Sequence, residues 1–334
     1  MHLPYQMVTL QIREKTLEYF AALDFPGFSP FVFVIPEIDL GFLAFGPIPI
    51  RWYAMSYILS VIVGLYYASK IISRPKLYGG APSPISKDDM DETFTWALLG
   101  GILGGRIGYL AFYRFPHADA RAIIADDPLS LLRIWEGGLS FHGGFIGVCL
   151  AIFLVARMRK IPLWSLADIW AMLTPIVIFS VRVFGNFFNA ELYGRHTDSS
   201  LGMIFPEGYT PNNYGPPVSY DVVEKAWVYL GTEMPRHPSQ IYEGILEGLI
   251  PFLLLAFLAW RFKILKRPGL ATGLFFIMYG IGRSIVENFR QPDAGIGFIF
   301  GEITTGMILS TPIWIAGAWL IWNATKQKPL SAPD

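Results

Sequence analysis

The sequence predicts an all-α, polytopic integral membrane protein with seven transmembrane helices and an extramembrane lobe between the fourth and the fifth. Of its 334 residues, 53% are hydrophobic and only 16% are charged. Ordinary soluble domains carry about a quarter charged residues, so this chain has too little charge to cover a soluble globule. A helix needs roughly 20 mostly apolar residues to cross about 30 Å of hydrocarbon. Seven segments meet this requirement: 52–69, 94–113, 139–156, 164–188, 241–262, 271–289 and 304–322.

Basic residues near the segment ends predict the orientation, because cytoplasmic loops of membrane proteins are enriched in Lys and Arg. They gather after the first, third and fifth segments and in the tail: Lys70, Arg74, Lys76, Lys87, Arg157, Arg159, Lys160, Arg261, Lys263, Lys266, Arg267, Lys326 and Lys328. With seven segments, these places share the cytoplasmic side if the N-terminus lies outside and the C-terminus inside. The loop after the second segment fits less well, since it carries Arg114, Arg121 and Arg133.

The chain divides into three parts. Residues 1–50 form an N-terminal extension in which 8–23 alternates apolar and charged residues at roughly helical spacing. This pattern is typical of an amphipathic segment in the outer membrane interface, and equally of a soluble helix. Residues 51–322 are the transmembrane domain, and 189–240, rich in Gly, Pro, Asn and Tyr, is its lobe on the outer side. Residues 323–334 are a cytoplasmic tail.

Composition excludes several classes of function. A single cysteine cannot form a disulfide within the chain, and this hydrophobicity is incompatible with intrinsic disorder. A net charge of zero without a basic block gives no electrostatic basis for nucleic-acid binding. The chain has no P-loop, no dinucleotide fingerprint and no His-Glu-x-x-His, and its five histidines are scattered. We therefore expect neither a nucleotide cofactor nor a metal.

The sixth segment contains Tyr279, Arg283 and Glu287, spaced four and four. Such a series drifts only about 40° per step around a helix, so all three share one face. Ionisable groups inside a span are costly, about 2.5–3.5 kcal/mol each, and default to functional candidates. An Arg283–Glu287 pair would lower that cost. A purely structural ion pair explains the pattern equally well.

His142 stands at the mouth of the third segment, followed by Gly143 and Gly144. Paired glycines let a ligand or another backbone come close, and neutral imidazole can accept a proton near pH 7. Helix packing is the alternative, because Gly143 and Gly147 form a small-xxx-small motif. A glycine ladder in the second segment also predicts close packing, and Arg106 inside it is a weaker candidate for binding phosphate.

Polar side chains leave the membrane together at the outer end of the fourth segment: Arg182, Asn186, Asn189 and Glu191, followed by Gly194. A helix end anchored at the interface is the simpler interpretation, but the density of amides is unusual for an anchor.

Together these groups predict a membrane pocket with two arginines that opens toward the outer leaflet. Paired guanidiniums bind phosphate bidentately, so a phospholipid headgroup is the natural ligand. Two alternatives stay open from the residues alone. Intramembrane Arg, Glu and His also line ion paths in transporters and channels, although the chain lacks the inverted repeats or interrupted paired spans that transporters often show. A non-enzymatic lipid-binding or scaffold protein is the other alternative.

Four sequence blocks, in order along the chain, resemble those of one enzyme family. They are Trp-Glu-Gly-Gly-Leu-Ser-Phe-His-Gly-Gly around His142, Gly-Asn-Phe-Phe-Asn-x-Glu-x-x-Gly from Gly185 to Gly194, Arg-His-Pro-Ser-Gln-Ile-Tyr-Glu from Arg236 to Glu243, and Tyr-x-x-x-Arg-x-x-x-Glu-Asn-Phe-Arg-Gln-Pro-Asp from Tyr279 to Asp293. Arg51-Trp52-Tyr53 also looks like the entry into the family's first span. The resemblance, from about residue 46 to 322, is to bacterial phosphatidylglycerol–prolipoprotein diacylglyceryl transferases.

The resemblance implies a multi-pass enzyme of the bacterial inner membrane, with the outer lobe in the periplasm. Such enzymes transfer the sn-1,2-diacylglyceryl group of phosphatidylglycerol to the thiol of the lipobox cysteine of a prolipoprotein. This first step of lipoprotein maturation forms a thioether and releases glycerol phosphate. The implied partners are phosphatidylglycerol, prolipoproteins and the bilayer, with no cofactor and no metal.

On this basis we expect five catalytic residues, namely His142, Arg283, Arg182, Tyr279 and Tyr53. His142 is expected to take the thiol proton or to orient the headgroup, and Arg283 to neutralise the leaving phosphate with help from Arg182. The two tyrosines would hydrogen-bond the headgroup or the arginines. The residues expected to bind substrate are Asn186, Asn189, Glu191, Gly194, Glu287, Gly143, Gly144 and Arg106.

One departure from the family affects Arg182. The family's arginine stands three residues before the asparagine that matches Asn186, and here that position is Val183. A shift by one residue turns a helical side chain by about 100°. Either a π-bulge absorbs the extra residue, or Arg182 points elsewhere.

Overall fold

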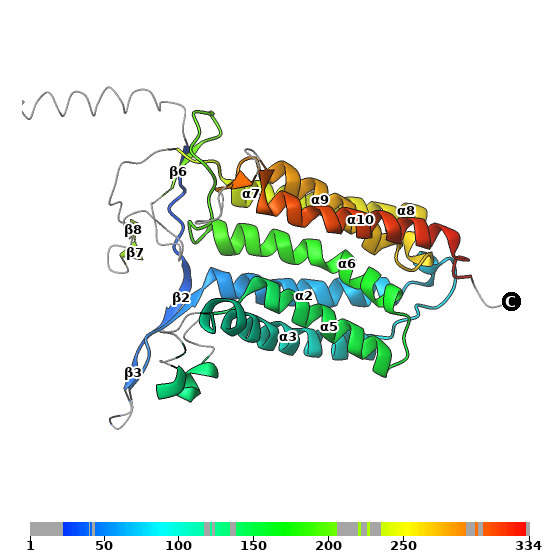
Figure 1. Cartoon of the computed structure of the whole chain (residues 1–334), viewed down its shortest axis with the longest axis horizontal. Helices are drawn as coiled ribbons and strands as arrows, with labels where there is room; N and C mark the ends of the chain where they lie inside the picture. Colours follow the sequence, from blue (N-terminus) through cyan, green and yellow to red (C-terminus); the bar gives the residue numbers. More distant parts are fainter. Residues whose placement is uncertain are drawn as a thin grey trace, which may run out of the picture. The chain divides into compact units, whose positions relative to one another are not determined.

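The computed structural model describes residues 23–39, 41, 44–116, 121, 124–133, 138–205, 220–221, 226–227, 235–291, 298–299 and 303–331. Helices cover nearly all of each of the seven predicted segments (Figure 1). They are α2 Trp52–Ile72, α3 Lys87–Tyr109, α5 Phe141–Met158, α6 Leu163–Ser180, α7 Ser239–Glu243, α8 Ile250–Phe262, α9 Leu270–Val286 and α10 Thr305–Lys326. Three π-helices continue them: η2 Leu110–Arg114 after α3, η5 Val181–Phe187 after α6, and η6 Gly244–Leu249 between α7 and α8. Short 3₁₀ turns are η1 Pro75–Tyr78, η3 Pro128–Leu131 and η7 Ile264–Lys266.

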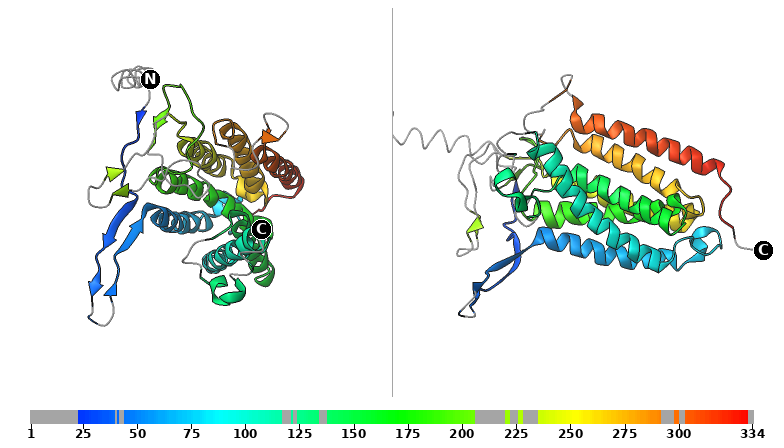
Figure 2. Two further views of the ribbon diagram at one scale, coloured as in Figure 1. Left: turned by 60° about the vertical axis from the view of Figure 1, so that its left-hand side comes forward. Right: turned by 60° about the horizontal axis from the view of Figure 1, so that its bottom comes forward.

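Short strands, which the all-α prediction omits, pair into five two-stranded sheets among the described residues. The pairs are β1 Leu23–Asp24 with β6 Met203–Ile204, β2 Phe31–Ile35 with β5 Ile48–Arg51, β3 Ile38–Asp39 with β4 Ala44–Phe45, β7 Tyr220–Asp221 with β8 Ala226–Trp227, and β9 Phe298–Ile299 with β10 Ile303–Thr304. The β1–β6 pair is parallel and the others are antiparallel. Strand β5 leads directly into α2, and its ribbon with β2 runs outward from the start of that helix (Figure 2).

Two predicted features lie wholly or partly outside the described residues. The amphipathic segment at 8–23 is described only at Leu23. The lobe at 189–240 is described at 189–205, 220–221, 226–227 and 235–240. Its boundaries therefore stay a prediction.

Among the described residues, three helical stretches are long and apolar enough to cross a membrane: Trp52–Ile72, Leu163–Phe187 and Ser239–Phe262. Two shorter apolar helices are His142–Met158 and Leu270–Val286. The helices expose large apolar side chains, such as Ile62 on α2 and Leu253 on α8, while polar side chains such as Ser60 on α2 are buried. Continuous exposed apolar surface of this kind is typical of helices that face lipid.

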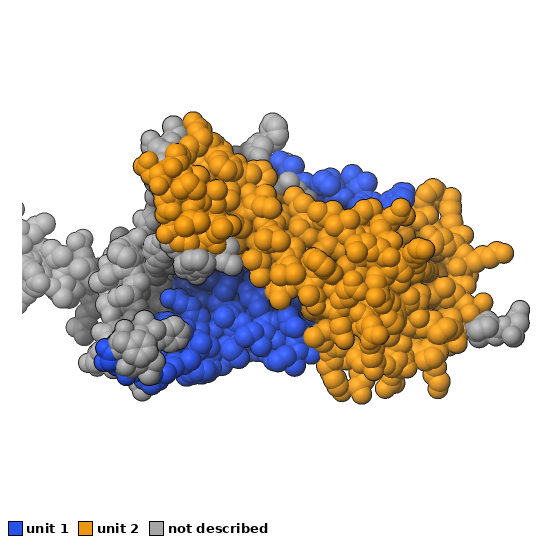
Figure 3. Space-filling view, turned by 90° about the horizontal axis from the view of Figure 1, so that it is seen from below, with its two compact units in different colours: residues 1–64, 172–256, 273–319 blue, residues 65–171, 257–272, 320–334 orange. Residues whose placement is uncertain are grey.

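The chain separates into two compact units (Figure 3). The first contains residues 1–64, 172–256 and 273–319, and the second contains 65–171, 257–272 and 320–334. The boundaries fall inside α2, α6, α8, α9 and α10. We describe each unit separately.

In the second unit, α3 and α5 pack glycine against glycine, as the ladder predicts. A Cβ atom added to Gly104 would collide with the carbonyl oxygen of Gly143, and one added to Gly147 would collide with that of Gly100. Backbones approach this closely only where both helices lack side chains. The packing interpretation of Gly143 and Gly147 is therefore confirmed.

Gly104→Ala is expected to destabilise the protein by roughly 1–3 kcal/mol, the usual cost of overpacking a tight contact. Gly101→Ala is the matched control on the same helix, because a Cβ there would meet only the Val148 side chain, at 3.3 Å. Thermal unfolding in detergent should show a lower midpoint for the first variant and little change for the second. Equal midpoints for both variants would show that α3 and α5 can move apart at no cost.

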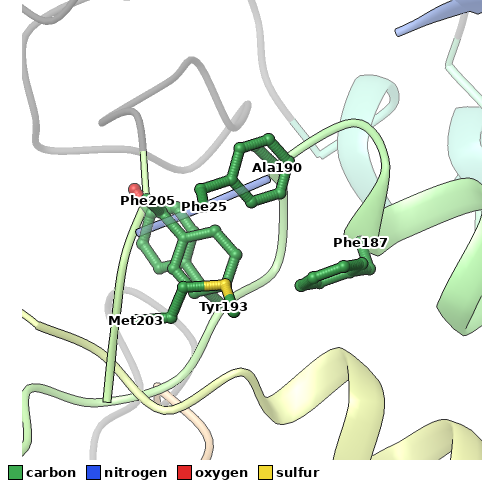
Figure 4. Packing of buried hydrophobic residues seen from close by; sticks show 6 residues of the cluster. All are labelled: Phe25, Phe187, Ala190, Tyr193, Met203 and Phe205. Atoms are coloured by element: carbon green, nitrogen blue, oxygen red, sulfur yellow. The ribbon is translucent and has the colours of Figure 1, made fainter. Parts of the chain in front are cut away.

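A small apolar core in the first unit lies at the end of η5. Phe25, Phe187, Ala190, Tyr193, Met203 and Phe205 pack together there (Figure 4). Phe25 follows β1, and its backbone nitrogen donates to the carbonyl of Ile204 at 3.1 Å. The end of η5, the loop after it and the described end of the N-terminal extension are thus joined into one structure.

Candidate functional site

Six charged side chains of the first unit lie close together. They come from η5, from α7 and η6, and from α9 with the turn that follows it. The carboxylates are almost completely buried, whereas the arginine side chains retain between 16% and 24% of their exposure. We call this group the Arg–Glu cluster; its members are Arg182, Arg283, Arg290, Glu243, Glu247 and Glu287.

Glu243 is the centre of the cluster. Its Oε2 lies 2.7 Å from Arg182 Nε and 3.9 Å from Arg283 Nη1. Its Oε1 lies 3.4 Å from Arg290 Nε. One buried carboxylate therefore faces three guanidiniums that come from separate parts of the chain. Such an arrangement offsets the cost of burying charge only if the geometry is fixed.

Arg283 and Glu287 form the predicted i, i+4 ion pair, with 2.9 Å between Nη2 and Oε2. The pair is not isolated, because Arg283 Nη1 also lies 3.9 Å from Glu247 Oε1. Tyr279, one turn earlier on α9, packs its ring against Phe275 with 5.9 Å between centroids. Arg283 therefore faces three carboxylates and not only the one that the spacing predicts.

Of the two outcomes that the shifted arginine leaves open, the structure contains the π-helix. Residues 181–187 form η5, and the wider turn absorbs one extra residue. Arg182 therefore reaches the cluster, and its Nη1 donates to Asn186 Oδ1 at 3.2 Å. Val183 instead packs against α7–η6, where a Cβ on Gly244 would lie 2.9 Å from its side chain.

Arg182→Ala is expected to reduce the diacylglyceryl transfer that the resemblance implies by about 10²-fold or more. The substitution removes a guanidinium that pairs with the buried carboxylate of Glu243. Val183→Ala is the matched control, since it changes the neighbouring side chain at an apolar contact and leaves the charges in place. The activity measured for each variant should be compared at equal amounts of folded protein. A larger loss for Val183→Ala would mean that the family's arginine position, and not Arg182, carries the role.

Amide side chains link η5 to the loop that follows it. Asn186, which is buried, donates from Nδ2 to Glu191 Oε1 at 2.8 Å. Gln240 Nε2 donates to the backbone carbonyl of Glu191 at 2.6 Å. Burial raises the pKa of the Glu191 carboxyl group, and the hydrogen bond from Asn186 opposes that rise. Asn189 Oδ1 is buried and has no hydrogen-bond partner among the described residues.

Gly194 lies where two segments cross next to the cluster. The backbone nitrogen of Gly194 donates to the carbonyl oxygen of His237 at 2.8 Å. The backbone nitrogen of Arg195 donates to the carbonyl oxygen of Phe289 at 2.9 Å. The Arg195 side chain donates to the carbonyls of Glu287, at 3.1 Å, and Arg290, at 2.7 Å. These bonds fix the turn after α9, which carries two members of the Arg–Glu cluster.

Tyr53, on the first turn of α2, lies beside η5. Its ring would lie 3.1 Å from a Cβ placed on Gly185. Its hydroxyl is 3.4 Å from that of Tyr57. The structure thus places Tyr53 against the segment that carries Arg182.

The other predicted site residues belong to the second unit. His142 is exposed on the first turn of α5, before Gly143 and Gly144. Arg106 is buried on α3 and donates to three backbone carbonyls, those of Ser130, Leu131 and Gly138. These bonds favour a structural role for Arg106, and its binding of phosphate stays a prediction. Among the described residues, no group of three or more His, Cys, Asp or Glu side chains could hold a metal ion.

Sequence reasoning missed three cluster members. Glu243 and Glu247 lie in the fifth predicted segment, and the rule that singles out ionisable groups inside spans would have found both. Arg290 lies beyond the end of α9, where an arginine is unremarkable in sequence. Only the fold brings Arg290 Nε to 3.4 Å from Glu243 Oε1.

Comparisons with known proteins show which family the sequence matches. The sequence model of a family described as prolipoprotein diacylglyceryl transferase matches residues 41–323. Three similar proteins carry the name phosphatidylglycerol–prolipoprotein diacylglyceryl transferase. The one from Caulobacter vibrioides is 40% identical over 91% of this chain and 95% of its own length. The one from Caulobacter sp. strain K31 is 41% identical over 92% of this chain and 97% of its own length. The one from Brucella canis is 38% identical over 93% of this chain and 97% of its own length.

Proposed function

The chain belongs to the prolipoprotein diacylglyceryl transferase family, and we propose that its Arg–Glu cluster binds the phosphate of the lipid substrate. The protein is a membrane-bound bacterial transferase that moves the diacylglyceryl group of phosphatidylglycerol to prolipoproteins, the first step of lipoprotein maturation. Its substrates are therefore phosphatidylglycerol and prolipoproteins. The location of the site and the role of each residue are our proposals.

One observation carries the placement of the site. Arg182 and Arg283, from two different helices, meet at one buried carboxylate. Arg182 Nε lies 2.7 Å from Glu243 Oε2, and its Nη1 donates to Asn186 Oδ1. Two guanidiniums held at fixed positions in a low dielectric are suited to a phosphodiester, which each can bind through parallel N–H groups.

The reaction requires one bond to form and one to break. The lipobox thiolate attacks the glyceryl carbon, the S–C bond forms, and the C–O bond to phosphate breaks with both electrons going to the departing glycerol phosphate. A thiol with a pKa of about 8.5 is a weak nucleophile until it loses its proton, and His142 receives that proton or orients the headgroup. Arg283 and Arg182 stabilise the charge that grows on the phosphate oxygen.

The remaining residues prepare this geometry. Glu287 fixes the rotamer of Arg283 through the 2.9 Å pair. Tyr279 and Tyr53 hydrogen-bond the headgroup or the arginines. The residues that shape the pocket around the headgroup are Asn186, Asn189, Glu191 and Gly194.

We infer seven spans in the inner membrane, with the N-terminus in the periplasm and the C-terminus in the cytoplasm. A helix covers nearly all of each segment, and the Lys and Arg residues gather after the first, third and fifth segments and in the tail. In this topology residues 51–322 are the catalytic domain, 189–240 its periplasmic lobe, 1–50 an N-terminal extension and 323–334 a cytoplasmic tail. The outer end of α6, with η5, then places the cluster near the outer leaflet.

The test is transfer in detergent micelles. The purified protein should move radiolabelled diacylglyceryl from phosphatidylglycerol to a peptide with a lipobox cysteine, and should not act on a peptide with serine in its place. Micelles hold no ion gradient, so activity there excludes a transporter that needs one. Failure to label the cysteine peptide under conditions where the protein is folded would refute the proposal.

A further inference from the structure

The Arg–Glu cluster contains its own anion at the point where three guanidiniums meet. Its three arginines are balanced by three glutamates. The carboxylate oxygens of Glu243 lie 2.7 Å from Arg182 Nε, 3.9 Å from Arg283 Nη1 and 3.4 Å from Arg290 Nε. The Glu243 side chain is 1% exposed, so it cannot turn away into solvent. Any phosphate that enters the cluster must share the guanidiniums with this carboxylate.

The charge of the ligand changes during the reaction. Phosphatidylglycerol is a phosphodiester with one negative charge, whereas glycerol phosphate is a monoester. A monoester has a second pKa of about 6 and carries nearly two negative charges at neutral pH. Guanidiniums arranged to stabilise the leaving phosphate therefore attract the product more strongly than the substrate. Tight retention of the product would limit turnover, because release is rate-limiting in many enzymes.

We propose that Glu243 is a charge-balancing residue that promotes release of the dianionic product. This inference depends on the proposed function, since it assumes that the headgroup phosphate binds at the cluster. The carboxylate competes with the phosphate for the same guanidiniums and repels a dianion more strongly than a monoanion. Substrate binding weakens modestly, and product binding weakens more.

Glu247 contributes in the same direction and to a smaller extent. Its Oε1 lies 3.9 Å from Arg283 Nη1. Glu243 and Glu247 are four residues apart on α7–η6, and they face Arg283 together. Two like charges at this spacing repel each other, so the arginines must stay close for both to remain buried. The pair thus keeps the cluster neutral when no lipid is bound.

The sign of one measurement separates this role from a structural one. If Glu243 only held the arginines in place, removing its charge would loosen them and weaken phosphate binding. If it balances charge, Glu243→Gln should bind glycerol phosphate at least about 10-fold more tightly, because the site gains one net positive charge and keeps a side chain of the same shape. Both proteins are to be purified full-length in detergent and titrated with glycerol phosphate by calorimetry.

Kinetics give a second readout. Glu243→Gln is expected to slow the turnovers that follow the first, so that a burst of product precedes a lower steady rate. Added glycerol phosphate should inhibit the variant at about 10-fold lower concentration. Glycerol phosphate affinity that is unchanged or weaker in Glu243→Gln overturns the proposal.

Controls keep the test decisive. Glu92→Gln breaks a carboxylate–guanidinium pair of the second unit, in which Glu92 Oε2 lies 3.1 Å from Arg159 Nη1, and it should leave glycerol phosphate binding unchanged. If Glu243→Gln fails to fold, Glu247→Gln replaces it and should tighten binding by about 3-fold; no tightening there refutes the inference. Arg283→Ala tests the site itself: equal binding by this variant and the unaltered protein refutes the proposed phosphate site, whatever the glutamate variants do.

Discussion

Arg283→Ala is expected to reduce diacylglyceryl transfer by roughly 10³-fold or more, the range that an arginine stabilising phosphoryl charge reaches in other enzymes. The Arg283 side chain is 16% exposed, and its guanidinium lies within 3.9 Å of three carboxylates. Its removal takes away the charge that neutralises the leaving phosphate. It also leaves the site with one net negative charge, which repels the lipid headgroup. The loss should therefore appear in kcat and in KM together.

The measurement is transfer of radiolabelled diacylglyceryl to a lipobox peptide, with a thermal unfolding midpoint recorded for each variant. Arg283→Lys is the matched control, because it keeps the charge but loses the planar fork that binds two oxygens. We expect its activity to lie between those of the unaltered protein and the alanine variant. Normal transfer by Arg283→Ala would exclude this guanidinium from the reaction.

The helices and part of the site can be predicted from the sequence, because both follow from the free-energy cost of placing polar groups in the hydrocarbon of a membrane. Apolar segments of sufficient length predict the helices, and ionisable residues inside them predict buried polar clusters. The four-residue spacing of Arg283 and Glu287 predicts an ion pair on one helix, and in the structure Arg283 Nη2 lies 2.9 Å from Glu287 Oε2. The π-helix at η5 is one of the two outcomes that the one-residue shift of Arg182 leaves open, and the structure shows which of them occurs.

The rest depends on contacts between distant segments. Nothing in the sequence states that Arg290 would approach Glu243, 47 residues away (290 − 243) and in a different element. The parallel pair of β1 with β6 has only two residues on each strand, too few for an alternating pattern to predict. Buried Asp168 on α6 was overlooked for another reason: it caps the start of α9 by accepting from Gly269 and Thr272, and such caps between helices have no local signature.

Gly194→Ala is expected to abolish activity although it adds only one methyl group. A Cβ at this position would collide with the carbonyl oxygen of Phe289 and lie 3.0 Å from the backbone oxygen and the Cβ of His237. Two of these atoms belong to backbone, so no rotamer change relieves the collision. The Gly194 segment would have to move away from the turn after α9.

That movement would break the hydrogen bonds that hold the turn, including the donation of Arg195 to the carbonyl of Phe289. Glu287 and Arg290 lie on the same turn, so the pairs Glu287–Arg283 and Arg290–Glu243 would lose their geometry. Errors of about 1 Å in such positions cost about 10²-fold in rate, and here two members of the cluster shift at once. Gly101→Ala is the control, since it adds the same methyl group where only a side chain must yield. Transfer by Gly194→Ala at more than a tenth of the normal rate would mean that the loop accommodates a side chain and does not fix the turn.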